Sequence, residues 1–600
     1  MNKSALLVIC IAICSFALPS VSEEQTEDIY ISKVKLKGTG DISKKEIQKS
    51  IATEFPSFLP WKKKPVFDEE ILKEDMIRIA SLYKENGFYD VKVKYDLKQK
   101  NESHVEIIID IDQGEGVILK ELNLNVIPTL LQQESKELMN VISLNEGGYF
   151  SAKEYQRTKN IIKNYFSNIG YPFADIRAEA LVNRVQKWAK VDIAVTKGDK
   201  YYFGKQSIEG NKKIEEKIIS REILYRAGEE YSLEQLDRTR LAIFGLGYFS
   251  SVVIDTTFDD KQHSADTNIR VEEKKLGSIK IGIGYGTEDL FRGQIIWNRK
   301  NLFGGARDFE VSGKFSFLTQ RLNASLLQPY LFDRDMDFIS TLLIARDDFP
   351  SYTSEGILFS NKIEKEIFNN INFNTSFNIQ VSSLSEISGS TAEFVQNDDY
   401  FLTFFSIGLN RSSVDNPLNP KKGTRLGLDL ESSLGVLGSD EDFITAVFEF
   451  IGYREFRNVV FAKRIDIGII QPFSSTDSLD VPIFKRFFAG GSTTMRGVPF
   501  QELGPLDSNG DPVGGNTLLL GNLEARYPIY KKLGGVLFLD YGNVFADEFD
   551  FDFGEIKYAI GTGLRLDTII GPLRVDFGYT LNPEPNIDRF QFFLSIGHAF

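Results

Sequence analysis

RFQFFLSIGHAF, residues 589 to 600, ends the sequence with apolar residues at alternate positions. The residues that fall on one face of the strand predicted by this alternation are Phe590, Phe592, Leu594, Ile596 and Phe600. The same period of two recurs upstream, for example in GSIKIGIGYG (277–286) and LRVDFGYT (573–580), with Gly, Asn and Asp turns between such segments. The chain after Lys275 is therefore predicted to be a series of β-strands.

Alternating strands are compatible with a soluble β-sandwich and with a membrane barrel. Lipid offers no hydrogen-bonding partner, so a strand structure that crosses it has to close on itself. The 48 Phe and 23 Tyr residues, the terminal Phe and the export signal described below favour the barrel. At roughly 20 residues per strand and connection, the 325 residues after Lys275 (600 − 275) predict a transmembrane antiparallel β-barrel of about sixteen strands over residues 276–600.

The N-terminus indicates export. Lys3 precedes an apolar run, residues 5–18, that is too short to span a bilayer and gives way to small residues, so residues 1–22 are predicted to be a signal peptide. Cys10 and Cys14 both lie inside it, and the expected mature chain therefore has no thiol, disulfide or Cys-based metal site. The net charge of −14 argues against nucleic acid as a partner.

Three repeats precede the predicted barrel. VFDEEILKEDMIRIASLYKENGFYD and YFSAKEYQRTKNIIKNYFSNIGYPFAD each place a glycine, Gly87 or Gly170, 20 residues after a phenylalanine, Phe67 or Phe150. YSLEQLDRTRLAIFGLGYFSS reaches Gly247 after 16 residues, about one helical turn earlier. Each copy predicts a helix that ends at a glycine, with a strand and a first helix before it and a strand pair after it. The α+β units predicted in this β-α-α-β-β order cover residues 28–113, 114–199 and 200–274.

The repeat resembles the polypeptide-transport-associated (POTRA) domain, a periplasmic module that binds extended chains at its sheet edge; three domains acting only as spacers are the alternative. The C-terminal part is similar to the outer-membrane insertase superfamily, which contains BamA, TamA and the two-partner secretion pores. The segments that carry this likeness are WNRKNLFGGARDF (297–309), QPYLF (328–332), DNPLNPKKGTRL (415–426) and FLDYGNVF (538–545). A terminal Phe on such a strand resembles the signal by which outer-membrane barrels are recognised.

FFAGGSTTMRGVPF (487–500) matches the superfamily's signature loop, which folds into the lumen with an Arg-Gly pair, here Arg496-Gly497, at its tip. Many members carry a valine before the arginine and an aromatic residue after the glycine, where this chain has Met495 and Val498. The residues that match the family's acidic partners, and that strand parity places inward, are Glu524 and Asp540. A guanidinium suits such carboxylates, so a loop latch is predicted; an arginine in a solvated channel loop is the alternative.

The first and last strands are predicted to form a weak lateral seam. Glycine in a strand reduces side-chain packing, so Gly282, Gly284 and Gly286 are interpreted as the residues that weaken the first strand at the seam. The alternative is that they only fill space on the lumen side. The opposite edge of the seam is expected at Phe592, Leu594, Ile596 and Phe600.

No nucleophile elbow, phosphate loop or metal-ligand spacing occurs, so an enzyme, a cofactor and a metal site are not expected. The resemblance implies an outer-membrane assembly factor that inserts or translocates unfolded outer-membrane or autotransporter clients into a lipid bilayer. Three POTRA units are more similar to the TamA type, with an inner-membrane-anchored TamB-like partner, than to BamA, which typically has five. A two-partner-secretion pore is the alternative, but it typically has two POTRA units and a plug helix.

Overall fold

The structure is a computed structural model that describes residues 29–56, 65–129, 132–333, 335–368, 370–474, 476–530, 532–568, 572–583 and 588–596. The predicted signal peptide, with Cys10 and Cys14, lies outside these residues, and so does Phe600. The chain divides into two compact units, each described by itself, and the third repeat contributes segments to both.

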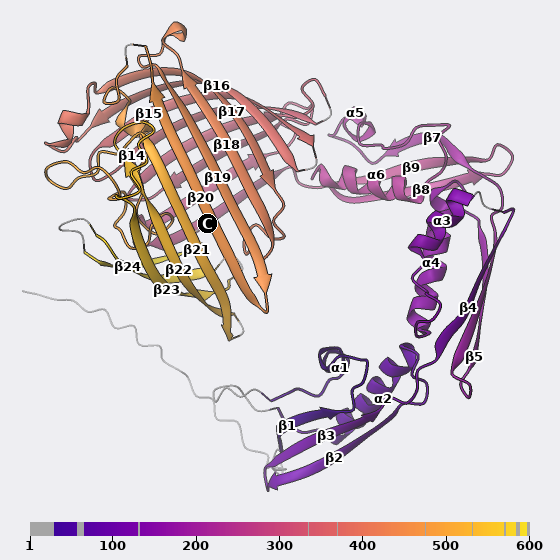
Figure 1. Cartoon of the computed structure of the whole chain (residues 1–600). Helices are drawn as coiled ribbons and strands as arrows, with labels where there is room; N and C mark the ends of the chain where they lie inside the picture. The colour runs from indigo at the N-terminus through magenta and orange to yellow at the C-terminus, as the bar shows by residue number, and fades with distance from the viewer. Residues whose placement is uncertain are drawn as a thin grey trace, which may run out of the picture. The chain divides into compact units, whose positions relative to one another are not determined.

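Each N-terminal repeat has the predicted order β-α-α-β-β (Figure 1). The first repeat comprises β1 (Tyr30–Lys37), α1 (Lys44–Ser50), α2 (Glu69–Glu85), β2 (Lys92–Asn101) and β3 (His104–Asp112). The second comprises β4 (Ile118–Ile127), α3 (Gln132–Val141), α4 (Ala152–Asn168), β5 (Asp175–Asn183) and β6 (Trp188–Thr196). The third comprises β7 (Tyr202–Glu209), α5 (Glu216–Ser220), α6 (Leu233–Gly245), β8 (Phe249–Asp259) and β9 (Ser264–Glu273).

The three sheets share one topology, with strand orders β1-β3-β2, β4-β6-β5 and β7-β9-β8. In the first two sheets the central strand pairs parallel with the first strand of the repeat and antiparallel with the other. The last strand of each repeat is therefore covered on both sides, and the two remaining strands lie at the sheet edges. Open edges of this kind can accept a further strand.

The glycines that mark the repeats end the second helix of each unit. Gly87, Gly170 and Gly247 have φ values of 95°, 95° and 72°, in the left-handed region that glycine adopts without strain. α2 and α4 contain 17 residues each and α6 contains 13, which agrees with the shorter third copy in the sequence.

The C-terminal part is an antiparallel sheet of 16 strands, in sequence order from β10 to β25, which confirms the predicted barrel (Figure 1). Its first eight strands are β10 (Gly277–Gly286), β11 (Leu290–Arg299), β12 (Asp308–Phe315), β13 (Thr319–Gln328), β14 (Met336–Asp348), β15 (Thr353–Phe368), β16 (Ile371–Ser385) and β17 (Asp399–Ser412). The other eight are β18 (Gly423–Ser433), β19 (Phe443–Phe456), β20 (Val459–Pro472), β21 (Thr517–Tyr530), β22 (Leu533–Phe545), β23 (Lys557–Leu566), β24 (Leu573–Thr580) and β25 (Phe590–Ile596). Short 3-10 helices in the loops are η1 (Thr391–Phe394), η2 (Gly435–Leu437) and η3 (Ile483–Lys485).

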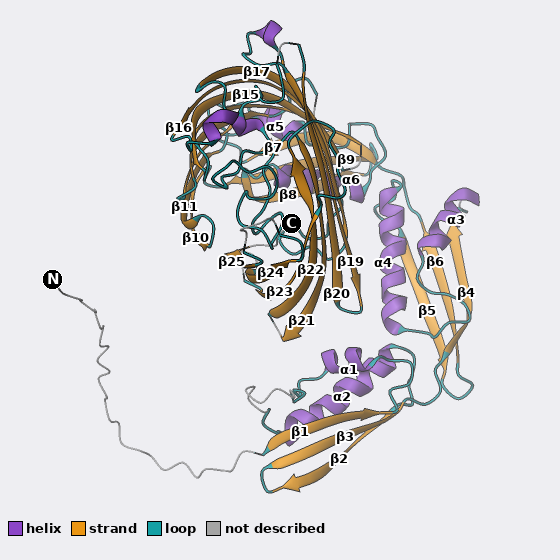
Figure 2. Cartoon of the chain, turned by 60° about the vertical axis from the view of Figure 1, so that its left-hand side comes forward, coloured by secondary structure: helices purple, strands orange, loops and turns teal. Residues whose placement is uncertain are grey.

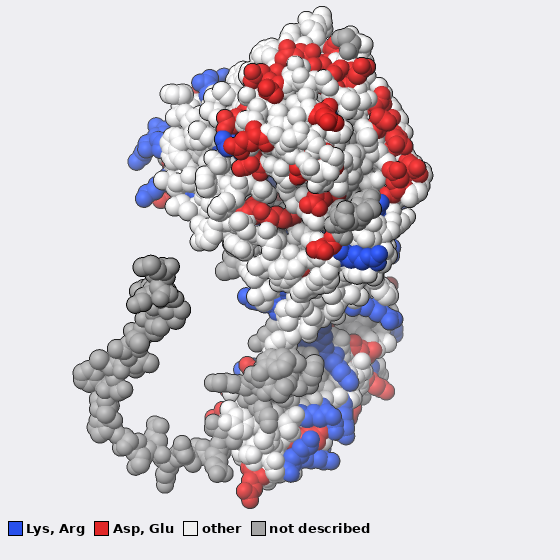
Figure 3. Space-filling view, turned by 90° about the vertical axis from the view of Figure 1, so that its left-hand side faces the viewer, with Lys and Arg blue, Asp and Glu red and all other residues white. Residues whose placement is uncertain are grey.

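The strand alternation separates an apolar outer face from a charged inner face. Leu523 and Leu537 are 44% and 55% exposed on the outside, whereas Glu524 and Asp540 are 3% and 0% exposed. Charge is also abundant at the surface, and Asp and Glu gather on the barrel face drawn in Figure 3. None of the described helices is both long and apolar enough to cross a membrane.

Part of the third repeat contacts the connection between β11 and β12 within one compact unit. The Tyr248 hydroxyl donates to the Ala306 carbonyl at 3.0 Å and to Asp308 at 3.2 Å. The Asn301 side chain donates to the Lys213 carbonyl at 3.1 Å. These hydrogen bonds join the third repeat to the connection between β11 and β12.

Candidate functional site

The loop between β20 and β21, residues 473–516, folds back into the barrel, and loops drawn in teal lie within the curve of the sheet in Figure 2. Gly490 and Gly491 have φ values of 111° and 94°, which allow the reversal. The Gly491 N–H then donates to the Val498 carbonyl at 2.9 Å, closing a compact tip. Met495 and Val498, where the chain departs from the family pattern, are 0% and 3% exposed and belong to one apolar cluster with residues of β21, β22 and β23.

Arg496 lies at this tip and is 1% exposed. Its Nε and Nη2 donate to the two oxygens of Asp540 on β22, at 2.8 and 2.7 Å, in a bidentate pair. Its Nη1 forms an ion pair with Glu524 on β21. The Arg496 backbone N–H also donates to Asp540, at 3.1 Å. Main chain and side chain of this residue are thus both held by the barrel wall.

Neighbouring side chains hold the two carboxylates in place. Asn522 donates to Asp540 at 2.8 Å and to the Thr494 carbonyl at 2.6 Å, so it joins wall and loop. Arg526 donates to Glu524 at 2.7 Å. The guanidinium carbon of Arg496 lies 3.6 Å from the centroid of the Phe538 ring, an arrangement that favours a cation.

The loop main chain approaches the wall where glycine leaves room. A Cβ added at Gly578, on β24, would lie 1.7 Å from the Arg496 carbonyl oxygen. A Cβ added at Gly497 would lie 2.4 Å from the Thr580 hydroxyl, which itself donates to the Gly497 carbonyl at 2.6 Å. The Arg-Gly tip is therefore a close-packed contact with β24.

A second ionic group, which the sequence analysis did not single out, lies beside the first. Asp576 on β24 is 0% exposed and pairs with Arg565 on β23 at 2.7 Å and with Arg574 at 3.8 Å. The alternation in LRVDFGYT places Arg574 and Asp576 on the inner face, but nothing in the sequence indicates which loop or strand they meet. Within the described residues, no group of three or more His, Cys, Asp or Glu side chains is arranged to hold a metal ion.

Ser492 connects the loop to both edges of the sheet. Its backbone N–H donates to Glu288, in the turn between β10 and β11, at 2.8 Å, and its hydroxyl hydrogen-bonds to the same carboxylate. Its carbonyl accepts a hydrogen bond from Arg574 Nη2 at 2.8 Å, and Arg574 also hydrogen-bonds to Ser595 on the last strand. Sequence reasoning missed Glu288 because an acid in a short turn carries no distinguishing pattern.

Apart from Phe600, which lies outside the described residues, the residues expected at the seam lie on β10 and β25, the two ends of the strand order. Close to this junction, the Thr287 N–H donates to the Leu594 carbonyl at 3.1 Å, and the Leu594 N–H donates to the Thr287 hydroxyl at 3.3 Å. Phe592 is 47% exposed on the outside. Ile596 is the last described residue of β25.

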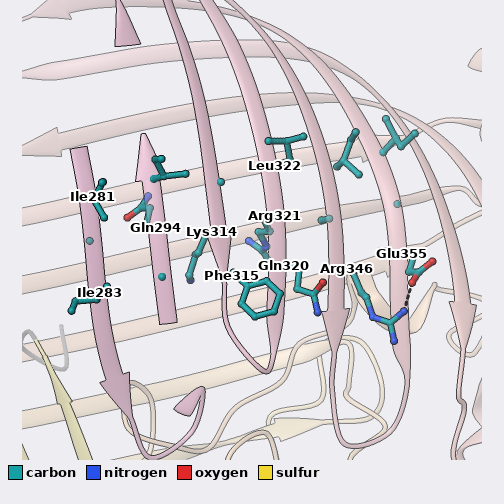
Figure 4. A pocket seen from close by; sticks show the side chains of 18 of the residues that line it. Ile281, Ile283, Gln294, Lys314, Phe315, Gln320, Arg321, Leu322, Arg346 and Glu355 are labelled. Carbon is teal, nitrogen blue, oxygen red and sulfur yellow. Dashed lines mark hydrogen bonds and ion pairs between the residues drawn. The ribbon is translucent and has the colours of Figure 1, made fainter. Parts of the chain in front are cut away.

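The wall beside this junction is hollowed. A cavity of about 1000 Å³ extends over β10 to β16, and Figure 4 shows Ile281 and Ile283 on β10 and the Arg346–Glu355 ion pair among its lining residues. A Cβ added at Gly282 would meet nothing nearer than the Gln294 Cβ, at 3.9 Å. Close packing therefore does not require glycine there. At Gly284 and Gly286 an added Cβ would meet the side chains of Arg292 and Asp289, at 2.6 and 2.8 Å.

Comparison with known proteins bears on this arrangement. The Omp85 superfamily domain matches residues 301–600, and the POTRA model, described as surface antigen variable number repeat, matches residues 29–114, 131–198 and 201–274. The chain is 24% identical over 593 residues to the outer membrane protein assembly factor BamA of Nitratidesulfovibrio vulgaris, covering 96% of this chain and 74% of that protein. It is 21% identical over 585 residues to BamA of Neisseria meningitidis serogroup B, covering 88% of this chain and 73% of that protein.

The fold also matches a solved structure, that of BamA from Haemophilus ducreyi lacking POTRA domains 1–3. The TM-score is 0.68 at 18% sequence identity, over 80% of this chain and 100% of the other. A barrel preceded by POTRA repeats places the protein in the outer membrane, with these repeats in the periplasm. The chain belongs to the Omp85 superfamily.

Proposed function

We propose that this protein is an outer-membrane assembly factor. In this proposal its POTRA repeats receive unfolded outer-membrane clients, autotransporter-type clients among them, and its barrel helps them enter the bilayer. The relatives described above carry the name of an assembly factor and align with nearly the whole chain. The single observation within the molecule that carries the proposal is the loop pinned inside the barrel by Arg496, Glu524 and Asp540.

The POTRA sheets supply a physical route for client capture. Each leaves two edge strands, for example β1 and β2 around the central β3. An extended client segment adds its backbone hydrogen bonds to such an edge, which recognises an unfolded chain with little dependence on its sequence. We further propose, from the three-repeat organisation, a TamA-type protein with an inner-membrane-anchored, TamB-like partner. Deletion of such a partner would then reproduce the loss of the protein itself.

The barrel is proposed to open laterally between β10 and β25. Support comes from the hollowed wall at β10 and from the spare room at Gly282. An opened edge has unpaired N–H and C=O groups that can template a client strand, because bare edges pair readily. In this scheme the pinned loop keeps strands β21, β22 and β24, which lie near the seam, in one arrangement while the seam separates.

Locking the seam tests the proposal. Cysteine pairs scanned between residues 280–286 and 591–596 would join the two edges, and residues 23–600 contain no Cys to interfere. In a strain depleted of the native protein, we expect the crosslinked barrel to stop client assembly and a reductant to restore it. Cysteines at Leu358 and Gln380, register partners on adjacent strands, are the control for an added disulfide.

Two outcomes would count against the proposal. Normal client assembly by a fully crosslinked seam would exclude lateral opening. Continued passage of a dedicated exoprotein through the locked barrel would favour the two-partner-secretion pore instead, because transport through a lumen does not need the edges to part.

A further inference from the structure

A pair of cations lies on the lipid-facing side of the wall. Lys463 on β20 alternates with Arg464, which hydrogen-bonds to the infolded loop, so Lys463 points to the opposite, outer face. Its strand neighbours on that face, Phe461 and Ile465, are 52% and 36% exposed. Arg454 on β19 faces the same way, as the register partner of Phe461.

Lys463 occupies a built position. It is the register partner of Gly452, and a Cβ added at Gly452 would lie 3.1 Å from the Lys463 Cε, so the lysine stem rests over a bare glycine. The Lys463 Nζ lies 4.8 Å from the centroid of the Phe450 ring. Together with Arg454, these side chains line a cavity of about 600 Å³.

The walls of this cavity are apolar. They are formed by the outward side chains of three neighbouring strands, Phe461 on β20, Leu523 and Ala525 on β21, and Leu537 and Leu539 on β22. This surface is the reverse side of the strands that hold the Arg-Gly loop, since Glu524 points inward between Leu523 and Ala525.

Neither cation has an anionic partner within the part of the chain that the structure describes, whereas Arg346 and Lys365 on the same outer face are paired with Glu355 and Asp333. Lys463 and Arg454 are thus two neighbouring cations on the outer wall of a chain whose net charge is −14. A charge on the lipid-facing wall is costly without a counter-ion, so an ionisable residue there indicates a functional partner.

The position of Lys463 along β20 identifies the membrane leaflet that the cavity faces. β10 begins on the side of the POTRA repeats, and antiparallel alternation brings the start of β20 to the same side. Lys463 is the fifth residue of β20 (Val459–Pro472) and follows a tight turn at Arg457 and Asn458. The cavity therefore opens in the periplasmic half of the wall, where a long lysine side chain can reach toward the headgroups.

We propose that Lys463 and Arg454 bind the phosphate of an anionic phospholipid of the periplasmic leaflet, with an acyl chain in the apolar cavity. The apolar walls accept a hydrocarbon chain. The two cations supply the positive charge that neutralises a phosphodiester at the edge of the hydrocarbon layer. A bound lipid would then brace the outside of the same strands whose inner face holds the loop.

The test uses the full-length chain in detergent micelles and native mass spectrometry. Phosphatidylglycerol and phosphatidylcholine with identical acyl chains are titrated separately, and bound lipid is counted. We expect phosphatidylglycerol to be retained over phosphatidylcholine, and the double variant Arg454→Gln/Lys463→Gln to weaken its retention about tenfold or more. Lys463→Arg in the native background should keep most of the retention, because it keeps the charge.

Lys365→Gln is the matched control, since it removes the same charge from the outer wall at a lysine already paired with Asp333 at 2.5 Å. A heat-modifiability gel checks that every variant is folded. Equal retention of the two lipids, an unchanged preference in the double variant, or an equal loss in Lys365→Gln would each overturn the proposal. Retention of lipopolysaccharide in place of phosphatidylglycerol would overturn the leaflet assignment.

Discussion

At the scale of single residues, Arg496 is the group on which the proposed latch depends. Removing a buried partner costs about 3–5 kcal/mol because the remaining charges lose their counter-ion. Arg496→Ala would leave Asp540 in this state, and would leave Glu524 with Arg526 alone. We expect the barrel to fold, since its strand ladder is untouched, but client assembly in a depleted strain to fall strongly.

The matched variant is Arg496→Lys, which keeps the charge but cannot form the bidentate pair with Asp540. It should therefore retain only part of the client-assembly activity that Arg496→Ala loses. A heat-modifiability gel separates folding from function. Full activity of Arg496→Ala would mean that the loop is ordinary channel lining.

Gly578 offers a steric test of the same contact. In Gly578→Ala the new methyl group would lie 1.7 Å from the Arg496 carbonyl oxygen, so loop or strand has to move. Such overpacking typically costs about 1–3 kcal/mol. We expect loss of client assembly with a folded barrel, as for Arg496→Ala. Gly293→Ala is the control, because a Cβ there meets nothing within 4 Å and should leave assembly unchanged. Equal effects of the two changes would argue against a close-packed tip.

At the scale of elements, the third repeat contains a carboxylate that orders a turn. Glu273, at the end of β9, accepts the backbone N–H groups of Lys212, Lys213 and Ile214 at 2.7, 2.7 and 2.9 Å. Burial raises the pKa of Glu273, but these three hydrogen bonds outweigh it and hold the pKa below its ordinary value. The stability that they contribute is therefore present above the ordinary carboxyl pKa and is lost as pH falls through the lowered one.

Hydrogen exchange of the 212–214 amides measures this contribution. We expect their protection to fall on acidification below the ordinary carboxyl range, relative to other amides of the same repeat. Glu273→Gln is neutral at every pH, so it should give weaker protection at neutral pH and no such acid-dependent loss. An identical acid profile in both proteins would assign the loss to another group.

At the scale of the whole barrel, Ser492 lets the loop hold both edges of the sheet. Its contacts run to Glu288 on the first hairpin and, through Arg574, to the last strand. A hydrogen bond to a charged group contributes about 1.5–3 kcal/mol, so Glu288→Ala should shift the seam toward its open state by roughly tenfold or more. The yield of the best seam disulfide from the cysteine scan is the readout, and it should fall.

Glu310→Ala removes an equal charge from the inner face of β12 without touching the loop, and should leave that yield unchanged. An unchanged yield in Glu288→Ala as well would show that the loop does not bridge the seam.

The sequence by itself determined the periodic features of this protein. A period of two separates lipid-facing from inward residues whatever the neighbouring strand is, so the barrel and its approximate strand number followed from residues 276–600 alone. The three POTRA repeats followed in the same way from helices that end at Gly87, Gly170 and Gly247. These are local properties, and a linear pattern records them.

Only the tertiary structure decided which charges meet. Parity places Arg574 and Asp576 on the inner face, but whether they meet each other, the loop or the last strand depends on strand stagger and on the path of residues 473–516 through the lumen. The same holds for Glu288 in its short turn and for Lys463, whose missing counter-ion is visible only when the neighbouring strands are in place. Pairing energies depend on separation in space, which alternation along one strand does not fix.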